Sequence, residues 1–250
     1  MLRLIIMTIS LIAVVAVNGA ANIVPFNGNT TVEISNRLPI LLTPASYVLL
    51  IWPVIYLLLT FWLFGVWVNR TNKENPMLNR RVFYFTLSSF FNIAWIVLWH
   101  YEYFTWTFVT MAALLVTLIA FYYTYPKNEN SFYERVPIAV YLGWIVISFI
   151  SNISYLLTLH EWHGWGLSTP LWTVIFLTIA TAIALHFMYH HSDIAFNFVF
   201  IWVFVGIAVK NGFEELFVSA AALFLTLVIV AATLFLPKKN RIAQSKKHHI

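Results

Sequence analysis

Aromatic and polar side chains recur at helical spacing inside apolar stretches of this chain. On one stretch they are three or four residues apart and so share one face of a helix: Tyr141, Trp144, Ser148, Asn152 and Tyr155. Two other stretches carry similar faces, formed by Ser88, Asn92, Trp95 and Trp99 and by Trp52 and Tyr56. Indole faces stack on flat molecules, and a few convergent polar groups orient them. The pattern favours an aromatic-walled pocket for a flat hydrophobic ligand, with hydrogen bonding between helices as the alternative.

Histidines form a second candidate constellation. His186 and His190 are four residues apart and, with His191 beside them, could present imidazoles to a metal ion. Nothing else in that region marks a further ligand, so we expect no metal site and treat these three residues as weak candidates. A cluster at the membrane interface that titrates near neutral pH is the alternative interpretation.

Several other chemistries lack the groups they need. The chain has no cysteine, which excludes disulfides and thiol catalysis. The apolar stretches carry neither a central lysine for a retinal Schiff base nor paired carboxylates for a proton relay. We therefore do not expect an enzyme, although chemistry at the histidines or on a tryptophan radical remains an alternative.

Composition places the chain in a membrane. Hydrophobic residues make up 61% and charged residues 9%, whereas a soluble domain has about a quarter charged residues. The net charge of +5 comes from basic residues in short loops and in the tail, so nucleic acid is not an expected partner. The expected partners are membrane lipids and a hydrophobic small molecule.

Eight apolar segments are long enough to cross a bilayer, which predicts an all-α integral membrane protein. They are residues 4–22, 45–68, 82–99, 104–125, 136–158, 167–188, 194–209 and 216–236. The first segment is followed by the small residues Gly19, Ala20 and Ala21, so a cleaved signal peptide is the competing interpretation. The seventh segment is the shortest and the weakest prediction.

Basic residues predict the orientation. With eight spans, both termini lie on one side of the membrane, and that side carries twelve of the 14 Lys and Arg residues. The positive-inside rule then places both termini in the cytoplasm. The loop 69–81 is expected to be solvated, and the basic tail from Pro237 is expected to be disordered.

The second span resembles the signature of the TspO/MBR family, the tryptophan-rich sensory proteins and translocator proteins. Trp52-Pro53-Val54-Ile55-Tyr56 is similar to its W-x-x-L-Y core, and Asn92-Ile93-Ala94-Trp95 is similar to its N-x-x-W motif. The fifth span resembles P-Y-L-x-W…L-N through Tyr141, Leu142, Trp144 and Asn152. These motifs fall within residues 1–160, which we interpret as a five-helix TspO-like bundle with a retained first helix. Residues 161–250 are interpreted as a three-helix membrane extension with a basic cytoplasmic tail.

The resemblance implies a function and a site. It implies binding of a tetrapyrrole such as protoporphyrin IX or a haem-like ligand, with no required cofactor, and a sensory or transport role in a bacterial plasma membrane. The outer loop 22–43 would be the lid of the pocket, and a homodimer is left open because family members often dimerise. The expected ligand-binding residues are Trp52, Tyr56, Asn92, Trp95, Tyr141, Trp144, Ser148 and Asn152. A secondary permease and a membrane enzyme that degrades a porphyrin-like or lipid substrate remain as alternatives.

Overall fold

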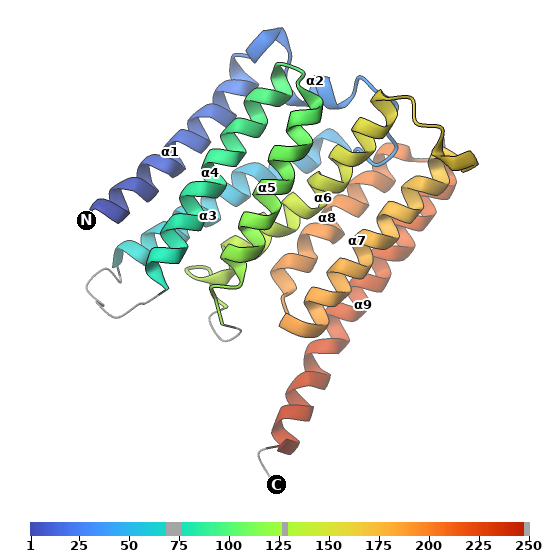
Figure 1. The fold of residues 1–250 in the computed structure, drawn as a ribbon. Helices are drawn as coiled ribbons and strands as arrows, with labels where there is room; N and C mark the ends of the chain where they lie inside the picture. Colours follow the sequence, from blue (N-terminus) through green and yellow to red (C-terminus); the bar gives the residue numbers. More distant parts are fainter. Residues whose placement is uncertain (69–76, 127–129, 248–250) are drawn as a thin grey trace. The chain divides into compact units, whose positions relative to one another are not determined.

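The computed structural model describes residues 1–68, 77–126 and 130–247, with the backbone alone from residue 237 onwards. These residues contain eight helices long and apolar enough to cross a membrane (Figure 1). The eight are α1 (Leu2–Ile23), α3 (Ile51–Val68), α4 (Leu78–His100), α5 (Phe104–Tyr122), α6 (Arg135–Leu159), α7 (Thr169–His191), α8 (Ile194–Asn211) and α9 (Leu216–Lys247). The prediction of an all-α chain with eight long apolar helices is confirmed, including its weakest segment, α8.

The chain divides into two compact units. The first comprises Met1–Ile40 and Leu49–Glu161, and the second comprises Leu41–Val48 and Trp162–Ile250. In the first unit α4 packs against α1 and α5, α6 packs against α5 and α3, and α3 packs against α1. These contacts join the five helices into a closed ring in the order α1, α4, α5, α6, α3. In the second unit α7, α8 and α9 each pack against the other two.

Local sequence explains where several elements begin. The short helix α2 (Thr31–Ser35) starts with a capping box, in which Thr30 and Glu33 each satisfy the backbone N–H of the other. The side chain of Asp193 caps α8 by accepting a hydrogen bond from the N–H of Phe196 at 3.2 Å. Pro53 lies in the first turn of α3, directly after the 3-10 helix Ser46–Leu50, where its fixed φ is compatible with a helix.

The start of α4 differs from the prediction. The helix begins at Leu78, whereas the predicted span begins at residue 82. The prediction that Arg81 lies in a solvated loop is wrong, because the residue is buried in α4. Its guanidinium donates to the carbonyl oxygen of Thr124 at 2.9 Å and lies 3.6 Å from the centre of the Tyr125 ring. These contacts compensate its burial through a hydrogen bond and a cation–π interaction. The loop residues 69–76 lie outside the described part of the chain.

The end of α9 also differs from the prediction. Its backbone is helical through Lys247, whereas the tail from Pro237 was predicted to be disordered. The apolar part that could span a membrane ends at Leu236. The helix therefore continues for about three turns beyond its apolar part, at 3.6 residues a turn.

Candidate functional site

Four aromatic rings from α3 and α6 form a cluster in the first unit. Trp52 stacks on Tyr56, one helical turn later, with ring centroids 5.6 Å apart and ring planes 23° apart. The rings of Tyr141 and Trp144 on α6 meet Trp52 edge-on, with centroid distances of 6.3 Å and 5.8 Å. Edge-on and offset arrangements are those that aromatic quadrupoles favour. Trp52 is thus in contact with the three other rings, and we call these four residues the Trp52 cluster.

A chain of hydrogen bonds leads to this cluster from two other helices. Asn18 on α1 donates from Nδ2 to Oδ1 of Asn92 on α4, at 2.8 Å. Asn92 in turn donates from Nδ2 to the hydroxyl of Tyr141, at 2.9 Å. Both asparagines are buried, and side-chain amides in an apolar bundle need such partners. The chain therefore ties α1, α4 and α6 together and fixes the position of the Tyr141 ring.

Asn18 was not among the predicted site residues. It is a polar residue inside the first apolar segment, and that isolated amide was the only signal in the sequence. Nδ2 of Asn18 also donates to the carbonyl oxygen of Val14, one helical turn earlier, at 3.0 Å.

A second aromatic group lies on α4, α5 and α6. Trp95 stacks on Trp99, with centroids 5.4 Å apart and planes 19° apart. The ring of Tyr155 lies 4.8 Å from Trp99 and 4.9 Å from Phe104. We call these four residues the Trp99 cluster. None of the ring contacts found among the described residues joins this cluster to the Trp52 cluster, so the aromatic residues of the three predicted faces fall into two groups.

The eight predicted site residues are distributed between these groups. Ring contacts or hydrogen bonds join five of them directly: Trp52, Tyr56, Asn92, Tyr141 and Trp144. Trp95 belongs to the Trp99 cluster instead. Asn152 donates to the hydroxyl of Thr107 on α5 at 3.2 Å, and Ser148 is half-buried on α6. The structure thus joins five of the eight predicted residues in one group and places Trp95 in the other.

Several buried polar atoms in both groups have no hydrogen-bond partner among the described residues. In the Trp52 cluster these atoms are Nε1 of Trp144 and the hydroxyl of Tyr56. In and beside the Trp99 cluster they are Nε1 of Trp95, Nε1 of Trp99 and Oδ1 of Asn152. An unsatisfied buried polar group costs roughly 1–3 kcal/mol, so proteins rarely keep one without a reason. These atoms therefore retain hydrogen-bonding capacity that the described residues do not use.

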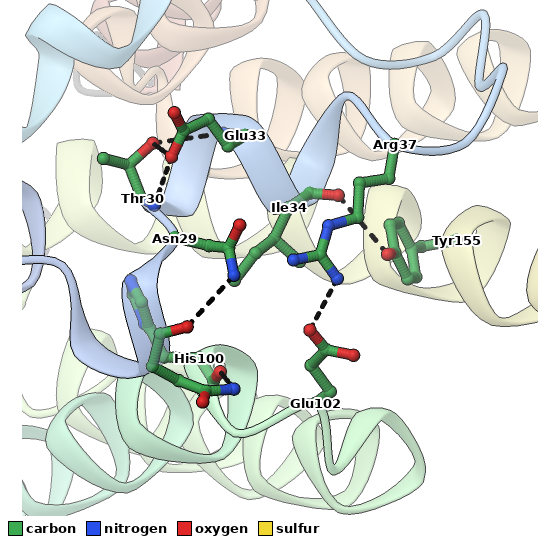
Figure 2. Close-up of polar contacts among 9 residues, drawn as sticks. Asn29, Thr30, Glu33, Ile34, Arg37, His100, Glu102 and Tyr155 are labelled. Carbon is green, nitrogen blue, oxygen red and sulfur yellow. Dashed lines mark hydrogen bonds and ion pairs between the residues drawn. The ribbon is translucent and has the colours of Figure 1, made fainter.

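The segment of residues 26–37, which follows α1, is fixed to the helix ends by polar contacts, which Figure 2 shows. Arg37 forms an ion pair with Glu102, in the turn between α4 and α5. The hydroxyl of Tyr155 donates to the carbonyl of Ile34 at 3.3 Å. Tyr155 thus connects α2 directly to the Trp99 cluster.

Further contacts involve His100, at the end of α4. Nδ2 of Asn27 donates to its carbonyl at 3.3 Å, and the hydroxyl of Thr31 lies 3.4 Å from its Nε2. The ring of Phe26 lies edge-on to the imidazole, at 5.6 Å. Residues 26–37 are therefore held to α4, α6 and the α4–α5 turn by four of their side chains and by the carbonyl of Ile34. Within this segment, hydrogen bonds from Thr30 lower the pKa of the Glu33 carboxyl below its usual value, and Arg37 adds to the effect.

The histidine constellation is incomplete. The rings of His186 and His190 lie 4.5 Å apart, and His191 packs on Phe187 at 5.5 Å. Within the part of the chain that the structure describes, no group of three or more His, Asp or Glu residues could hold a metal ion. Among the described residues, these histidines are therefore not arranged as the ligand set of a structural metal site.

Comparison with known proteins extends the resemblance along the chain. Residues 4–235 match the model of the family described as TSPO-like protein. The match includes α7, α8 and much of α9, beyond residue 160, where the motifs of the resemblance end. Neither a curated protein nor a solved structure matches the chain. Eight apolar helices and a family match across all of them identify a multi-pass membrane protein. The chain belongs to the TSPO-like protein family.

Proposed function

We propose that this protein binds a flat hydrophobic ligand, a tetrapyrrole such as protoporphyrin IX, at the Trp52 cluster. The observation that carries the proposal is the meeting of four aromatic rings with two unpartnered polar groups, Trp144 Nε1 and the Tyr56 hydroxyl. Membership of the TSPO-like family supports a ligand-binding or sensory role. Protoporphyrin here is a ligand of the protein and not a cofactor that it requires.

The chemistry of the cluster suits such a ligand. Indole and phenol faces offer stacking area to a flat conjugated ring. The N–H of Trp144 and the O–H of Tyr56 are donors, and the carboxylates of a porphyrin are acceptors. The chain Asn18–Asn92–Tyr141 holds one ring of the cluster in a fixed orientation, which reduces the entropy lost on binding.

Titration of protoporphyrin IX into the purified protein in nanodiscs tests this proposal, with the porphyrin absorption band and tryptophan fluorescence as readouts. Saturable binding to the parent is expected, and the double variant Trp52→Ala with Trp144→Ala is expected to lose it. Trp106→Ala is the matched control, because Trp106 is 62% exposed and belongs to neither cluster. Equal binding by the double variant and the parent would refute the assignment of the site.

The membrane placement is a further part of the proposal. Both termini are placed in the cytoplasm of a bacterial cell, with residues 22–43 on the outer side as a lid over the first unit. The asymmetry of Lys and Arg supports this orientation. Because the chain has no cysteine, single cysteines at Thr30 and Ser245 can be labelled with a membrane-impermeant maleimide in intact cells. Labelling at residue 30 and not at residue 245 is expected, and the reverse pattern would invert the topology.

The first five helices are proposed as the ligand-binding bundle and the last three as an extension of it. Sensing and transport differ in an observable way. Counterflow of porphyrin in proteoliposomes is expected of a transporter, whereas a sensor binds the ligand without moving it. Stoichiometric metal in the purified protein would instead favour the enzyme alternative.

A further inference from the structure

The hydrogen-bonded chain that ends at Tyr141 has a direction. A side-chain amide has an oxygen that accepts and an NH₂ group that donates, so a row of amides can run either way. Here Asn18 donates to Asn92 at 2.8 Å, and Asn92 donates to the hydroxyl of Tyr141 at 2.9 Å. All three residues belong to the first unit. The direction decides whether the Tyr141 hydroxyl accepts a hydrogen bond from the chain or donates one to it.

The backbone of α1 fixes this direction. Nδ2 of Asn18 also donates to the carbonyl oxygen of Val14 at 3.0 Å. A backbone carbonyl can only accept, so the amide of Asn18 cannot turn round without placing its oxygen against that of Val14. Both hydrogens of Nδ2 are then used, one for Val14 and one for Asn92. The atom of Asn92 that faces Asn18 must therefore be the acceptor Oδ1, which leaves its Nδ2 facing Tyr141.

Burial keeps the direction in place. Asn18, Asn92 and Tyr141 are all buried, so water does not compensate for a lost hydrogen bond there. Turning the amide of Asn18 brings oxygen against oxygen, and turning that of Asn92 brings its N–H against the N–H of Asn18. The chain therefore has one stable direction, which runs from α1 through α4 to α6.

The hydroxyl of Tyr141 keeps its own hydrogen as a result. It accepts from Asn92, and Oδ1 of Asn92 is turned towards Asn18, so the hydroxyl hydrogen has no acceptor on that side. Among the described residues, none accepts a hydrogen bond from this hydroxyl. The chain thus ends in an O–H donor on a ring that meets Trp52 edge-on.

The other polar groups of the Trp52 cluster are donors as well. Nε1 of Trp144 and the hydroxyl of Tyr56 are buried without a partner among the described residues. An indole N–H can only donate, and a phenol has one hydrogen to give. Together with Tyr141, the cluster offers three hydrogens and contains no carbonyl or carboxylate side chain. A carboxylate, which has about four acceptor sites and no hydrogen, is the ligand group that matches this set.

We propose that Asn18 is a positioning residue that makes the Tyr141 hydroxyl a hydrogen-bond donor, and that the Trp52 cluster binds its ligand through a carboxylate. Asn18 acts through Asn92 and not by touching the ligand. The role of the carboxylate rests on the proposed function, because it requires a ligand at the cluster. The direction of the chain does not, because it is a property of the protein alone.

Infrared spectroscopy of the protein in nanodiscs tests the direction without any ligand. The C–O stretching frequency of a phenol falls when its hydroxyl accepts a hydrogen bond and rises when the hydroxyl donates one. Labelling tyrosine with carbon-13 at the hydroxyl-bearing carbon, and subtracting the spectrum of Tyr141→Phe, isolates the band of Tyr141. In the parent this band is expected at the lower, accepting frequency. A parent band at the higher, donating frequency would overturn the proposal.

Asn18→Thr is the variant that should reverse the chain. On the same helix the hydroxyl of Thr8 donates to the carbonyl of Leu4 at 2.8 Å, and its oxygen accepts from Trp67 at 3.4 Å. A threonine at position 18 should likewise donate one turn back and present an acceptor to Asn92. The amide of Asn92 then turns, and the Tyr141 band is expected to move to the higher frequency.

Two further variants control this comparison. Asn18→Val has the shape of the threonine variant without its hydroxyl, so it leaves Asn92 free to bond Tyr141 in either direction, and a smaller upward shift is expected. Thr8→Val is the matched control, because it removes a polar group from α1 that lies outside the chain, and no shift is expected. An unshifted band in Asn18→Thr, or an equal shift in Thr8→Val, would overturn the role of Asn18.

A pair of ligands tests the carboxylate. Protoporphyrin IX and its dimethyl ester share the flat ring, but only the first carries carboxylates, so the parent is expected to bind the acid more tightly. The ratio of the two affinities is expected to fall about tenfold in Tyr141→Phe and to fall in Asn18→Thr, while Thr8→Val keeps it. Equal affinities of the parent for acid and ester, or a parent-like ratio in Tyr141→Phe, would overturn the carboxylate assignment.

The two experiments separate the possible failures. If the parent binds neither porphyrin, the proposed function and the carboxylate assignment fail together, and the infrared comparison still decides the direction of the chain. If both porphyrins bind and the infrared band of Asn18→Thr stays at the parent frequency, the proposed function stands and the role of Asn18 is wrong.

Discussion

The indole rings of Trp52 and Trp144 meet edge-on, with centroids 5.8 Å apart and planes 76° apart. Trp144 is 6% exposed, yet its Nε1 has no hydrogen-bond partner among the described residues. Trp52 therefore packs against a ring whose buried N–H is not hydrogen-bonded to any described residue. This combination of a packed face and an unpaired donor distinguishes the cluster from ordinary aromatic packing, in which the buried N–H is usually bonded.

Two substitutions at Trp144 should distinguish the contribution of ring stacking to porphyrin affinity from the contribution of hydrogen bonding. Trp144→Phe removes the donor but keeps an aromatic face, and we expect about a tenfold loss of porphyrin affinity, as for one hydrogen bond to a charged group. Trp144→Ala removes both and should cost more. Calorimetric titration measures both losses, with Trp106→Phe as the control. Equal affinities for Trp144→Phe and the parent would show that the donor does not contact the ligand.

Asn92 should contribute to stability through two partners at once. Asn92→Ala removes the acceptor of Asn18 and the donor to Tyr141, and we expect a loss of about 1–2 kcal/mol in the free energy of unfolding. Asn18→Ala should cost less, because it leaves the bond between Asn92 and Tyr141 intact. Unfolding in detergent mixtures measures both, and the double variant should lose less than the two single variants added together. Strict additivity would contradict the hydrogen-bonded chain.

The ion pair of Arg37 and Glu102 should be weak and sensitive to salt. Their side chains are 37% and 40% exposed, so we expect a coupling free energy of about 0.2–1 kcal/mol. A double-mutant cycle with Arg37→Ala and Glu102→Ala measures it, and raising the ionic strength should reduce it. The same variants test the proposed lid, since loosening residues 26–37 should speed porphyrin release more than it slows binding. Unchanged release rates would argue against a lid.

Acid should loosen α2 through Glu33. Hydrogen bonds from Thr30 lower the pKa of the folded-state carboxyl, so the carboxylate stabilises the capping box above its usual pKa of 4.5. This contribution is lost as the pH falls through the lower, folded-state pKa. Hydrogen exchange of the α2 amides, corrected for intrinsic rates, should therefore lose protection in acid. Glu33→Gln keeps a capping side chain that does not titrate, and its protection should depend less on pH.

Much of the fold could be predicted because a bilayer restricts what a chain can do. Long apolar runs without charge left few alternatives to eight helices, and even the short run at α8 formed a helix capped by Asp193. The start of α4 could not be predicted, because a charged residue such as Arg81 normally indicates a solvated loop. Its burial depends on contacts with Thr124 and Tyr125, which only the folded structure reveals. Charge predicts exposure only where tertiary partners are absent.

The sequence allowed most of the candidate residues to be predicted, but not which of them contact one another. Helical spacing places Asn92, Trp95 and Trp99 on one face of α4, yet Asn92 bonds Tyr141 whereas Trp95 stacks on Trp99. Spacing along one helix carries no information about which neighbour each residue meets. Asn18 was missed for the same reason, since its role depends on how α1 packs against α4.

The stretch 41–48 has a consequence for how the protein is made. Ribosomal synthesis delivers α3 to the membrane long before α8, so the carbonyls of Leu41 and Val48 and the N–H of Ala45 emerge without the partners they have in the folded chain. During that interval the entry to α3 has no fixed path. A nascent chain that stops before Trp202 should therefore insert its first helices yet leave the backbone groups of residues 41–48 without their partners on α8.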